Sequence, residues 1–341
     1  TAAAQAANYP FCTIEPNIGN VAVPDPRLDI LAKTAKSAQI IPTRISFVDI
    51  AGLVRGASKG EGLGNQFLGN IREVDAIVHV LRCFEDGDIT HVEGKIDPIA
   101  DADTVDTELM LADLDSLEKR IQPLEKKARN GDKEAIALAA LMNKALVLLR
   151  EGKPARLAKI EPEEQSAFEQ LGLITSKPVL YVANVEEESA ATGNAFSARV
   201  QEKAKAEGAE CVVFSARIES EIAVLPNEDR ADFLEAAGLP EAGLDRMIRA
   251  GYALLGLVTY FTVGPKETRA WTIVKGTKAP RAAGVIHTDF EKGFIRAETT
   301  AYDDYVAAGG EAGAKEAGKM RLEGKEYVVK DGDILMFRFA N

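Results

Sequence analysis

Residues 44–53, Arg-Ile-Ser-Phe-Val-Asp-Ile-Ala-Gly-Leu, decide the fold of this 341-residue chain. The run 44–50 is short, mostly apolar and rich in β-branched residues, which is typical of a buried strand. Asp49 and Gly52 form an Asp-x-x-Gly motif at its end. In nucleotide-dependent switch proteins such an Asp holds the magnesium shell, and such a Gly lets the backbone N–H approach the terminal phosphate. The motif therefore predicts a phosphate-binding switch; the alternative is a plain turn.

Strand patterns recur along the chain. Short apolar runs predict further strands at 75–81, 178–184 and 210–215, and helical patterns separate or follow them, for instance at 196–206 and 228–237. Strands that alternate with helices predict an α/β doubly wound sheet of the P-loop NTPase type.

A helical segment interrupts this alternation between about 106 and 172. Apolar residues in this segment are spaced three and four apart in two stripes, and a turn at 130–132 joins the stripes. The first stripe consists of Leu114, Leu117, Ile121, Leu124 and Ala128, and the second of Ala135, Leu138, Met142, Ala145 and Leu149. Two such stripes predict an antiparallel helical hairpin. The alternative is two ordinary amphipathic helices packed on the core. Pro123 should kink or break the first helix.

From about residue 259 onward, the sequence pattern changes from alternating strands and helices to short strands. Short strands are predicted at 260–263, 269–274, 285–287 and 334–339, between Gly and Pro turns. From 260 to the end there are 13 basic and 12 acidic residues, a net charge of +1, whereas the whole chain carries −12. Within this small β-rich domain, residues 265–281 form a basic stretch with one acidic residue, Glu267, and with the candidate partner-binding residues Lys266, Arg269, Lys275, Lys278 and Arg281.

Two more loops carry candidate ligand residues. Thr13 lies upstream of the Asp-x-x-Gly motif, where a loop hydroxyl can supply a second magnesium ligand beside Asp49. Asn184-Val-Glu-Glu187 ends a predicted strand, at the edge where open sheets bind ligands. Ser215 and Ala216 end the next strand and are typical of the short loop that abuts a nucleotide base.

The residues after Asn184 bear on which base is bound. A guanine site commonly has Asn-Lys-x-Asp, whose carboxylate accepts hydrogen bonds from the ring N–H and the exocyclic amine of guanine. Here Val185 stands in place of the Lys and Glu187 in place of the Asp. The longer side chain moves the acceptor, so we expect weaker selection of guanine.

Composition excludes several classes of protein. The chain has three cysteines, an odd number and far apart, which argues against a disulfide framework or a zinc site and fits the reducing cytoplasm. It shows no apolar run of the length that a membrane span needs. The net charge of −12 means that any nucleic-acid contact must come from a local basic face.

Several motifs together resemble the YchF subfamily of Obg-like ATPases, within the TRAFAC P-loop GTPase class. They are residues 9–13 (Tyr-Pro-Phe-Cys-Thr), 49–53, 60–65 (Gly-Glu-Gly-Leu-Gly-Asn), 184–187, 270–272 and the long stretch 285–298. The resemblance implies a nucleotide-binding G domain at 1–105 and 173–258, a helical hairpin insert at 106–172 and a C-terminal TGS domain at 259–341. It also implies ATP preferred over GTP, magnesium dependence and association with the ribosome.

The chain departs from the pattern of P-loop proteins in two ways. No G-x-x-x-x-G-K-[ST] motif occurs, so we expect that the P-loop lies in an N-terminal segment absent from these residues and that the chain as given is inactive. Leu53 stands where many GTPases place a water-orienting Gln, and the resemblance implies that the whole subfamily shares this replacement. Hydrolysis should therefore be slow, and the catalytic residue is not identified.

The expected function is a cytoplasmic, magnesium-dependent ATPase that acts as a switch on the ribosome. The ribosomal partner would be the large subunit, with RNA contacted through the TGS domain. Two alternatives stay open: a ribosome- or RNA-binding adaptor that does not hydrolyse nucleotide, and a true GTPase.

Overall fold

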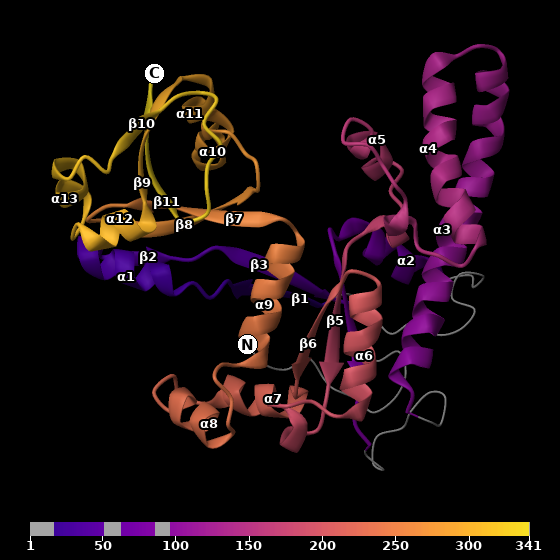
Figure 1. Cartoon of the computed structure of the whole chain (residues 1–341), viewed down its shortest axis with the longest axis horizontal. Coiled ribbons are helices and arrows are strands. Elements are labelled where there is room, and N and C mark those ends of the chain that lie inside the picture. Colours follow the sequence, from indigo (N-terminus) through magenta and orange to yellow (C-terminus); the bar gives the residue numbers. More distant parts are fainter. Residues whose placement is uncertain (1–16, 51–62, 86–95, 341) are drawn as a thin grey trace. The chain divides into compact units, whose positions relative to one another are not determined.

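The computed structural model describes residues 17–50, 63–85 and 96–340, and it confirms the predicted mixed α/β architecture (Figure 1). The chain divides into two compact units. Unit 1 comprises residues 1–19 and 48–247, and unit 2 comprises residues 20–47 and 248–341.

A parallel three-stranded sheet forms the centre of unit 1. Its order is β4-β5-β6, with β4 at Ile77–Arg82, β5 at Val179–Asn184 and β6 at Glu210–Phe214. The central strand β5 is buried along its length, as expected for an apolar strand with a neighbour on each side. Each of the three lies within two residues of its predicted position.

Helices pack around this sheet or follow it in the chain: α2 (Leu63–Glu73), α6 (Ala195–Ala206), α7 (Ala216–Val224), α8 (Arg230–Ala236) and α9 (Gly243–Leu254). Val200 and Ala204 of α6 are fully buried against β5, so α6 covers one face of the sheet. The helices α6 and α8 lie where the sequence predicts them.

The predicted helical hairpin is present as α3 (Pro98–Arg129) and α4 (Lys133–Arg150), which Figure 1 shows side by side. The expected break at Pro123 is wrong, because α3 runs through it as one helix. Leu117 and Ile121 before the proline and Leu124 after it all pack in the same apolar cluster with α4. This burial outweighs the one backbone hydrogen bond that proline removes.

Asp113 of α3 anchors the hairpin to the connection that leads back to the sheet. This connection contains η2 (Ala155–Leu157), α5 (Gln165–Glu169) and η3 (Ile174–Ser176). The Asp113 side chain is 1% exposed and accepts hydrogen bonds from Ile174 N (2.9 Å), Thr175 N (2.7 Å) and Thr175 Oγ1 (2.7 Å). Burial raises the pKa of the Asp113 carboxyl, and the three donors oppose that rise.

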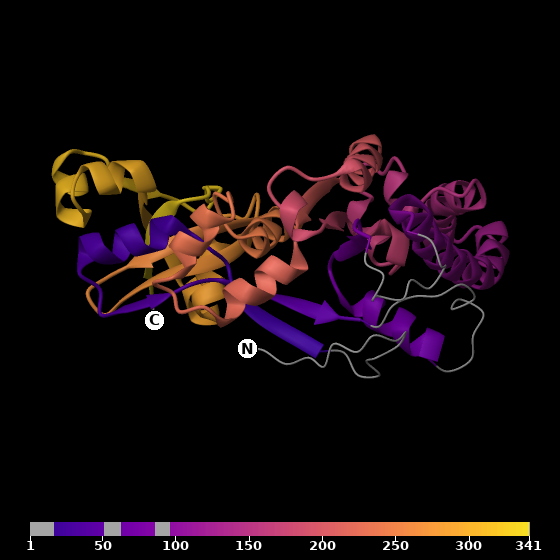
Figure 2. The same cartoon turned by 90° about the horizontal axis from the view of Figure 1, so that it is seen from below.

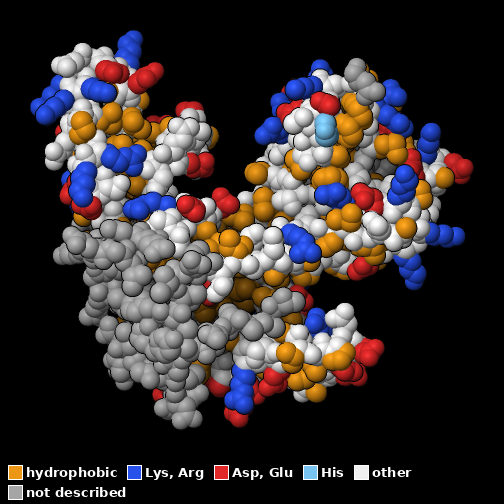
Figure 3. Space-filling view, turned by 180° about the vertical axis from the view of Figure 1, so that it is seen from behind, with side chains coloured by type: hydrophobic (Ala, Val, Ile, Leu, Met, Phe, Trp, Pro, Cys, Tyr) orange, Lys and Arg blue, Asp and Glu red, His pale blue; other side chains and the backbone are white. Residues whose placement is uncertain are grey.

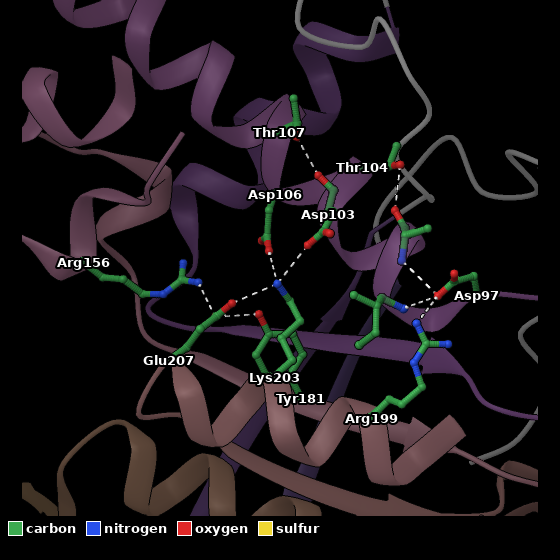
Figure 4. A network of polar contacts seen from close by, with 12 residues as sticks. Asp97, Asp103, Thr104, Asp106, Thr107, Arg156, Tyr181, Arg199, Lys203 and Glu207 are labelled. Carbon is green, nitrogen blue, oxygen red and sulfur yellow. Dashed lines mark hydrogen bonds and ion pairs between the residues drawn. The ribbon is translucent and has the colours of Figure 1, made fainter. Parts of the chain in front are cut away.

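A half-buried polar network joins α6 to α3 and to β5 (Figure 4). Glu207, which follows α6, accepts a hydrogen bond from Tyr181 Oη (2.8 Å) and pairs with Arg156 (3.0 Å) and Lys203 (2.9 Å). Lys203 also pairs with Asp103 of α3 (3.0 Å). Burial raises the pKa of Glu207, but its donors outweigh burial and hold the pKa below its usual value.

Unit 2 contains a six-stranded sheet (Figure 1; Figure 2). The order of its strands is β10-β9-β11-β7-β8-β2. The strands are β2 (Gln39–Ile41), β7 (Leu257–Val263), β8 (Glu267–Val274), β9 (Phe294–Ala301), β10 (Arg321–Glu323) and β11 (Asp333–Phe339). Strand β2 pairs in parallel with β8. Residues 20–47, which the sequence assigns to the G domain, thus fall in the unit of the C-terminal sheet, and the three-domain division stays a prediction.

Helices pack against both faces of the six-stranded sheet. They are α1 (Pro26–Ala35), α10 (Ala279–Ile286), α11 (Thr288–Lys292), α12 (Tyr302–Ala307) and α13 (Glu311–Glu316). Ala282 and Ala283 of α10 are fully buried against the sheet. The prediction of a strand at 285–287 is therefore wrong, because residues 285 and 286 are the last two residues of α10. The small alanines before them suit a helix that packs closely on a sheet.

Strands β1 (Asn17–Ala22) and β3 (Arg44–Asp49) form a separate two-stranded sheet. Ile45 and Phe47 of β3 pack with Ile248 and Tyr252 of α9. Among the described helices, none has the length and apolar character that crossing a membrane requires.

We predict that Asp113→Ala lowers the free energy of unfolding by about 2–4 kcal/mol, because it leaves two buried N–H groups and a hydroxyl without their acceptor. The matched control is Asp115→Ala, two residues along the same helix. Asp115 is 65% exposed and, within the described ranges, its ion pair is with Lys119, so its loss should cost less than about 0.5 kcal/mol. Urea unfolding of both variants measures the difference, and equal midpoints for the two would contradict the anchoring role.

Candidate nucleotide-binding site

The carboxyl ends of β5 and β6 meet at one edge of the sheet in unit 1. The two strands are parallel, and Asn184 at the end of β5 lies opposite Phe214 at the end of β6. Residues 185–187 and 215–217 therefore leave the sheet at the same edge. This is the edge at which open parallel sheets bind ligands.

Hydrogen bonds hold the two strand ends together. Asn184 Oδ1 accepts a hydrogen bond from the backbone N–H of Ala216 (2.9 Å), and Val185 N donates to the carbonyl of Phe214 (3.0 Å). Val185 is 2% exposed and belongs to the core of the sheet. With its Oδ1 engaged, Asn184 keeps its amide N–H groups as donors for a ligand.

Ser215 is placed as the N-cap of α7 but does not cap the helix with its side chain. The residue is 2% exposed, and its Oγ finds no hydrogen-bond partner among the described residues. Burying a hydroxyl without a partner costs about 1–3 kcal/mol. At the N-terminus of α7, the N–H of Ala216 is already bonded to Asn184 Oδ1.

The neighbouring acidic residue Glu186 has a structural role. Its carboxylate accepts hydrogen bonds from Ser189 Oγ and from Asn194 Nδ2 (2.9 Å). The same Nδ2 atom donates to the carbonyl of Cys83, beyond the end of β4 (2.6 Å). Burial raises the pKa of Glu186, but the hydrogen bonds outweigh it and lower the pKa. Glu186 therefore fixes the loop between β5 and α6.

The predicted base-reading residue Glu187 is paired with a cation. It begins the short helix η4 (Glu187–Ser189), and its Oε1 lies 2.6 Å from Nε of Arg217, in the first turn of α7. The Glu187 side chain is 42% exposed and that of Arg217 is 76% exposed. The structure thus brings all five predicted base-site residues to one edge: Asn184, Val185, Glu187, Ser215 and Ala216.

The predicted phosphate and magnesium residues are only partly placed. Thr13, Gly52 and Leu53 lie outside the described residues. Asp49 ends β3 and is exposed. In the described parts of the chain β3 pairs with β1 and not with the three-stranded sheet, so no described strand pairing joins Asp49 to the edge at Asn184. An exposed carboxylate is a hard oxygen ligand and suits Mg²⁺, alone or through water.

The predicted partner-binding residues lie in unit 2, where Figure 3 shows Lys and Arg side chains at several places on the visible face. Arg269 stacks its guanidinium over the ring of Trp271, with 4.0 Å to the ring centroid. Lys278 and Arg281 form ion pairs within unit 2, with Glu326 and Glu291. Lys266 and Lys275 are exposed, which leaves their charges accessible to a partner.

The histidine of β4 lies against the aromatic ring of the neighbouring strand β5. His79 is half-buried and stacks on Tyr181, with 5.8 Å between the ring centroids. Burial lowers the pKa of His79 to about 4, so the ring is neutral at pH 7. The described residues contain no cluster of three or more His, Cys, Asp or Glu side chains suited to a metal ion.

Two family profiles match the chain. Residues 257–340 match YchF-GTPase_C, described as a protein of unknown function (DUF933), and residues 1–144 match MMR_HSR1, described as a 50S ribosome-binding GTPase. The second match begins at residue 1, so it gives no support to the expected absence of an N-terminal segment.

Curated relatives extend the likeness to the whole chain. The ribosome-binding ATPase YchF of Haemophilus influenzae is 58% identical over 98% of this chain and 92% of the relative. The protein of the same name from Bacillus subtilis is 56% identical over 99% of this chain and 93% of the relative. This chain belongs to the YchF family.

A solved YchF structure agrees with the fold. The YchF GTPase of Schizosaccharomyces pombe is similar with a TM-score of 0.84 and 36% identity, over 97% of this chain and 90% of that one. Together with the GTPase-domain match, this identifies the sheet of unit 1 as part of a P-loop GTPase-type domain. The edge formed by Asn184 and Ala216 is accordingly the candidate nucleotide-binding edge of a YchF protein.

Proposed function

We propose that this chain is a ribosome-binding ATPase. The observation that carries the proposal is its 54–58% identity, over nearly its whole length, to several curated proteins named ribosome-binding ATPase YchF. Hydrolysis of a nucleotide follows from the same relatives and from the GTPase-domain match. Its place of action would be the cytoplasm, where ribosomes work.

The base of the nucleotide would sit at the edge where β5 and β6 end. Asn184 offers amide N–H groups there, and the buried Ser215 hydroxyl needs an acceptor. Purine ring nitrogens are hydrogen-bond acceptors, so both groups suit a purine. Val185 is buried in the sheet and supplies shape rather than a polar contact.

The base preferred would be adenine. Guanine selection requires a free carboxylate that accepts two N–H donors from the base. Glu187 is longer than the usual Asp and is already paired with Arg217. The name of the S. pombe relative favours a second candidate, a true GTPase, and base-competition measurements separate the two.

Magnesium would be held by Asp49 with Thr13. Bound Mg²⁺ supplies positive charge that stabilises the phosphate oxygens during transfer. Gly52 would offer its backbone N–H to the terminal phosphate, and Leu53 cannot orient water, so turnover would be slow. Residues 1–341 contain no G-x-x-x-x-G-K-[ST] motif. We propose that the ATPase activity requires such a motif, so residues 1–341 tested by themselves should not hydrolyse ATP. A non-hydrolysing ribosome-binding adaptor is the corresponding alternative.

The ribosomal partner would be the large subunit, as the description of the matching GTPase profile states for that family. RNA phosphates would meet the basic stretch of unit 2, which contains Lys266, Arg269, Lys275, Lys278 and Arg281. A local basic face is needed, since the net charge of the chain is −12.

The full natural chain should bind ATP at least as tightly as GTP, since the acceptor that reads guanine is displaced and paired. Calorimetric titration with each nucleotide and magnesium measures both values of Kd. GTP bound tenfold more tightly, about 1.4 kcal/mol, would establish the true GTPase instead.

Asp49→Asn in the full natural chain should weaken the magnesium-dependent part of ATP binding by about 10–100-fold, because a neutral amide is a poor partner for the metal shell. The readouts are the Kd of ATP with and without Mg²⁺ and the hydrolysis rate. Asp29→Asn, an exposed carboxylate of α1, is the control. An unchanged magnesium dependence in Asp49→Asn would remove Asp49 from the site.

The double change Lys266→Glu and Lys275→Glu should weaken ribosome association and flatten its salt dependence. Neither side chain is needed for a described ion pair of unit 2, so folding should persist. If each lysine contacts one phosphate, the slope of log K against log salt should fall by about 2. The control, Lys325→Glu with Lys330→Glu, changes the charge equally outside the basic stretch. Equal co-sedimentation of both double variants and wild type would show that the stretch is only a solvated face.

A further inference from the structure

The ion pair between Glu187 and Arg217 lies within the candidate base site. The hydrogen bond between Asn184 and Ala216 holds the two strand ends together. Glu187 follows Asn184 by three residues, and Arg217 follows Ala216 directly. The pair therefore joins the loop after β5 to the first turn of α7. A side chain that contacts Glu187 at this place competes with any base that Glu187 would read.

The donors of arginine and guanine are chemically alike. Guanidinium presents adjacent N–H groups in one plane, which match the two oxygens of a carboxylate. The ring N–H and the exocyclic amine of guanine form the same pattern. Adenine has no such pair, because its ring nitrogen at that edge is an acceptor.

Glu186 cannot take over the role of Glu187. Its carboxylate is engaged by Ser189 and Asn194 in the same loop. The Glu187 side chain, by contrast, is 42% exposed, and its Oε1 is ion-paired with Arg217, whose side chain is 76% exposed. A base could reach Glu187 if Arg217 moved away.

We infer that Arg217 determines base specificity: its guanidinium occupies the Glu187 carboxylate in the place of guanine and so disfavours guanine nucleotides. This inference rests on the proposed nucleotide-binding function. Guanine must displace Arg217 to reach its acceptor, whereas adenine leaves the pair intact. Because both side chains are exposed, the pair is weak, and the discrimination it supplies is about two- to fivefold.

The test is the ratio of the Kd for GTP to the Kd for ATP, measured by calorimetry with magnesium on the full natural chain. The ratio cancels the general effect of removing a positive charge near phosphates, which is equal for the two nucleotides. Arg217→Ala should lower the ratio by about two- to fivefold through tighter GTP binding. Arg217→Lys should lower it less, since lysine keeps the charge but not the planar donors.

Two further variants separate specificity from structure. In a Glu187→Gln background, Arg217→Ala should leave the ratio unchanged, because the contested carboxylate is gone. The matched control is Arg150→Ala, which breaks another exposed arginine–glutamate pair, with Glu118 of the helical hairpin, and should not change the ratio.

The outcomes are distinct. ATP binding in wild type with the same ratio in Arg217→Ala would overturn the inference and leave the proposed function standing. A lowered ratio that persists in the Glu187→Gln background would also overturn it, since the effect would not pass through Glu187. A wild-type protein that binds neither nucleotide would overturn the proposed function, and the inference with it.

Discussion

The parallel pairing of β5 with β6 is the constraint on which the candidate site depends. It places Asn184 opposite Phe214, and from this register follow the hydrogen bond between Asn184 and the Ala216 N–H and the ion pair between Glu187 and Arg217. A shift of one residue would turn each side chain to the other face of the sheet. The buried apolar strand β5 resists such a shift, so the core of unit 1 determines the chemistry at its edge.

The same edge combines satisfied and unsatisfied polar groups. Glu186 and Asn194 bond to each other, and Asn194 also bonds to Ser197 and to the carbonyl of Cys83, which gives the loop a defined shape. The buried Ser215 hydroxyl lacks a partner among the described residues, and the exposed Glu187–Arg217 pair can exchange partners. A rigid frame with a few exchangeable donors and acceptors is what selective recognition of a small planar ligand requires.

Sequence patterns predicted the elements whose signals are local. β4, β5 and β6 are mostly apolar runs, and α3 and α4 carry apolar stripes with heptad spacing. The patterns failed where distant contacts decide: packing against α4 keeps α3 whole at Pro123, and burial of Ala282 and Ala283 makes 285–286 helical. The three-residue strand β2 gains its place only by pairing with β8, more than 200 residues away. Likewise, the sequence does not predict that Arg217 pairs with Glu187, because this pair depends on the register of β5 and β6.

The most direct test of the account is hydrogen exchange of the full natural chain with and without ATP and magnesium. If the base binds where β5 and β6 end, the amides of residues 183–189 and 213–219 should exchange more slowly with ATP, that of Ala216 included. The amides of β9 in unit 2 should be unaffected and serve as the internal reference. ATP binding without protection of either segment would contradict the account, because the base would then lie elsewhere.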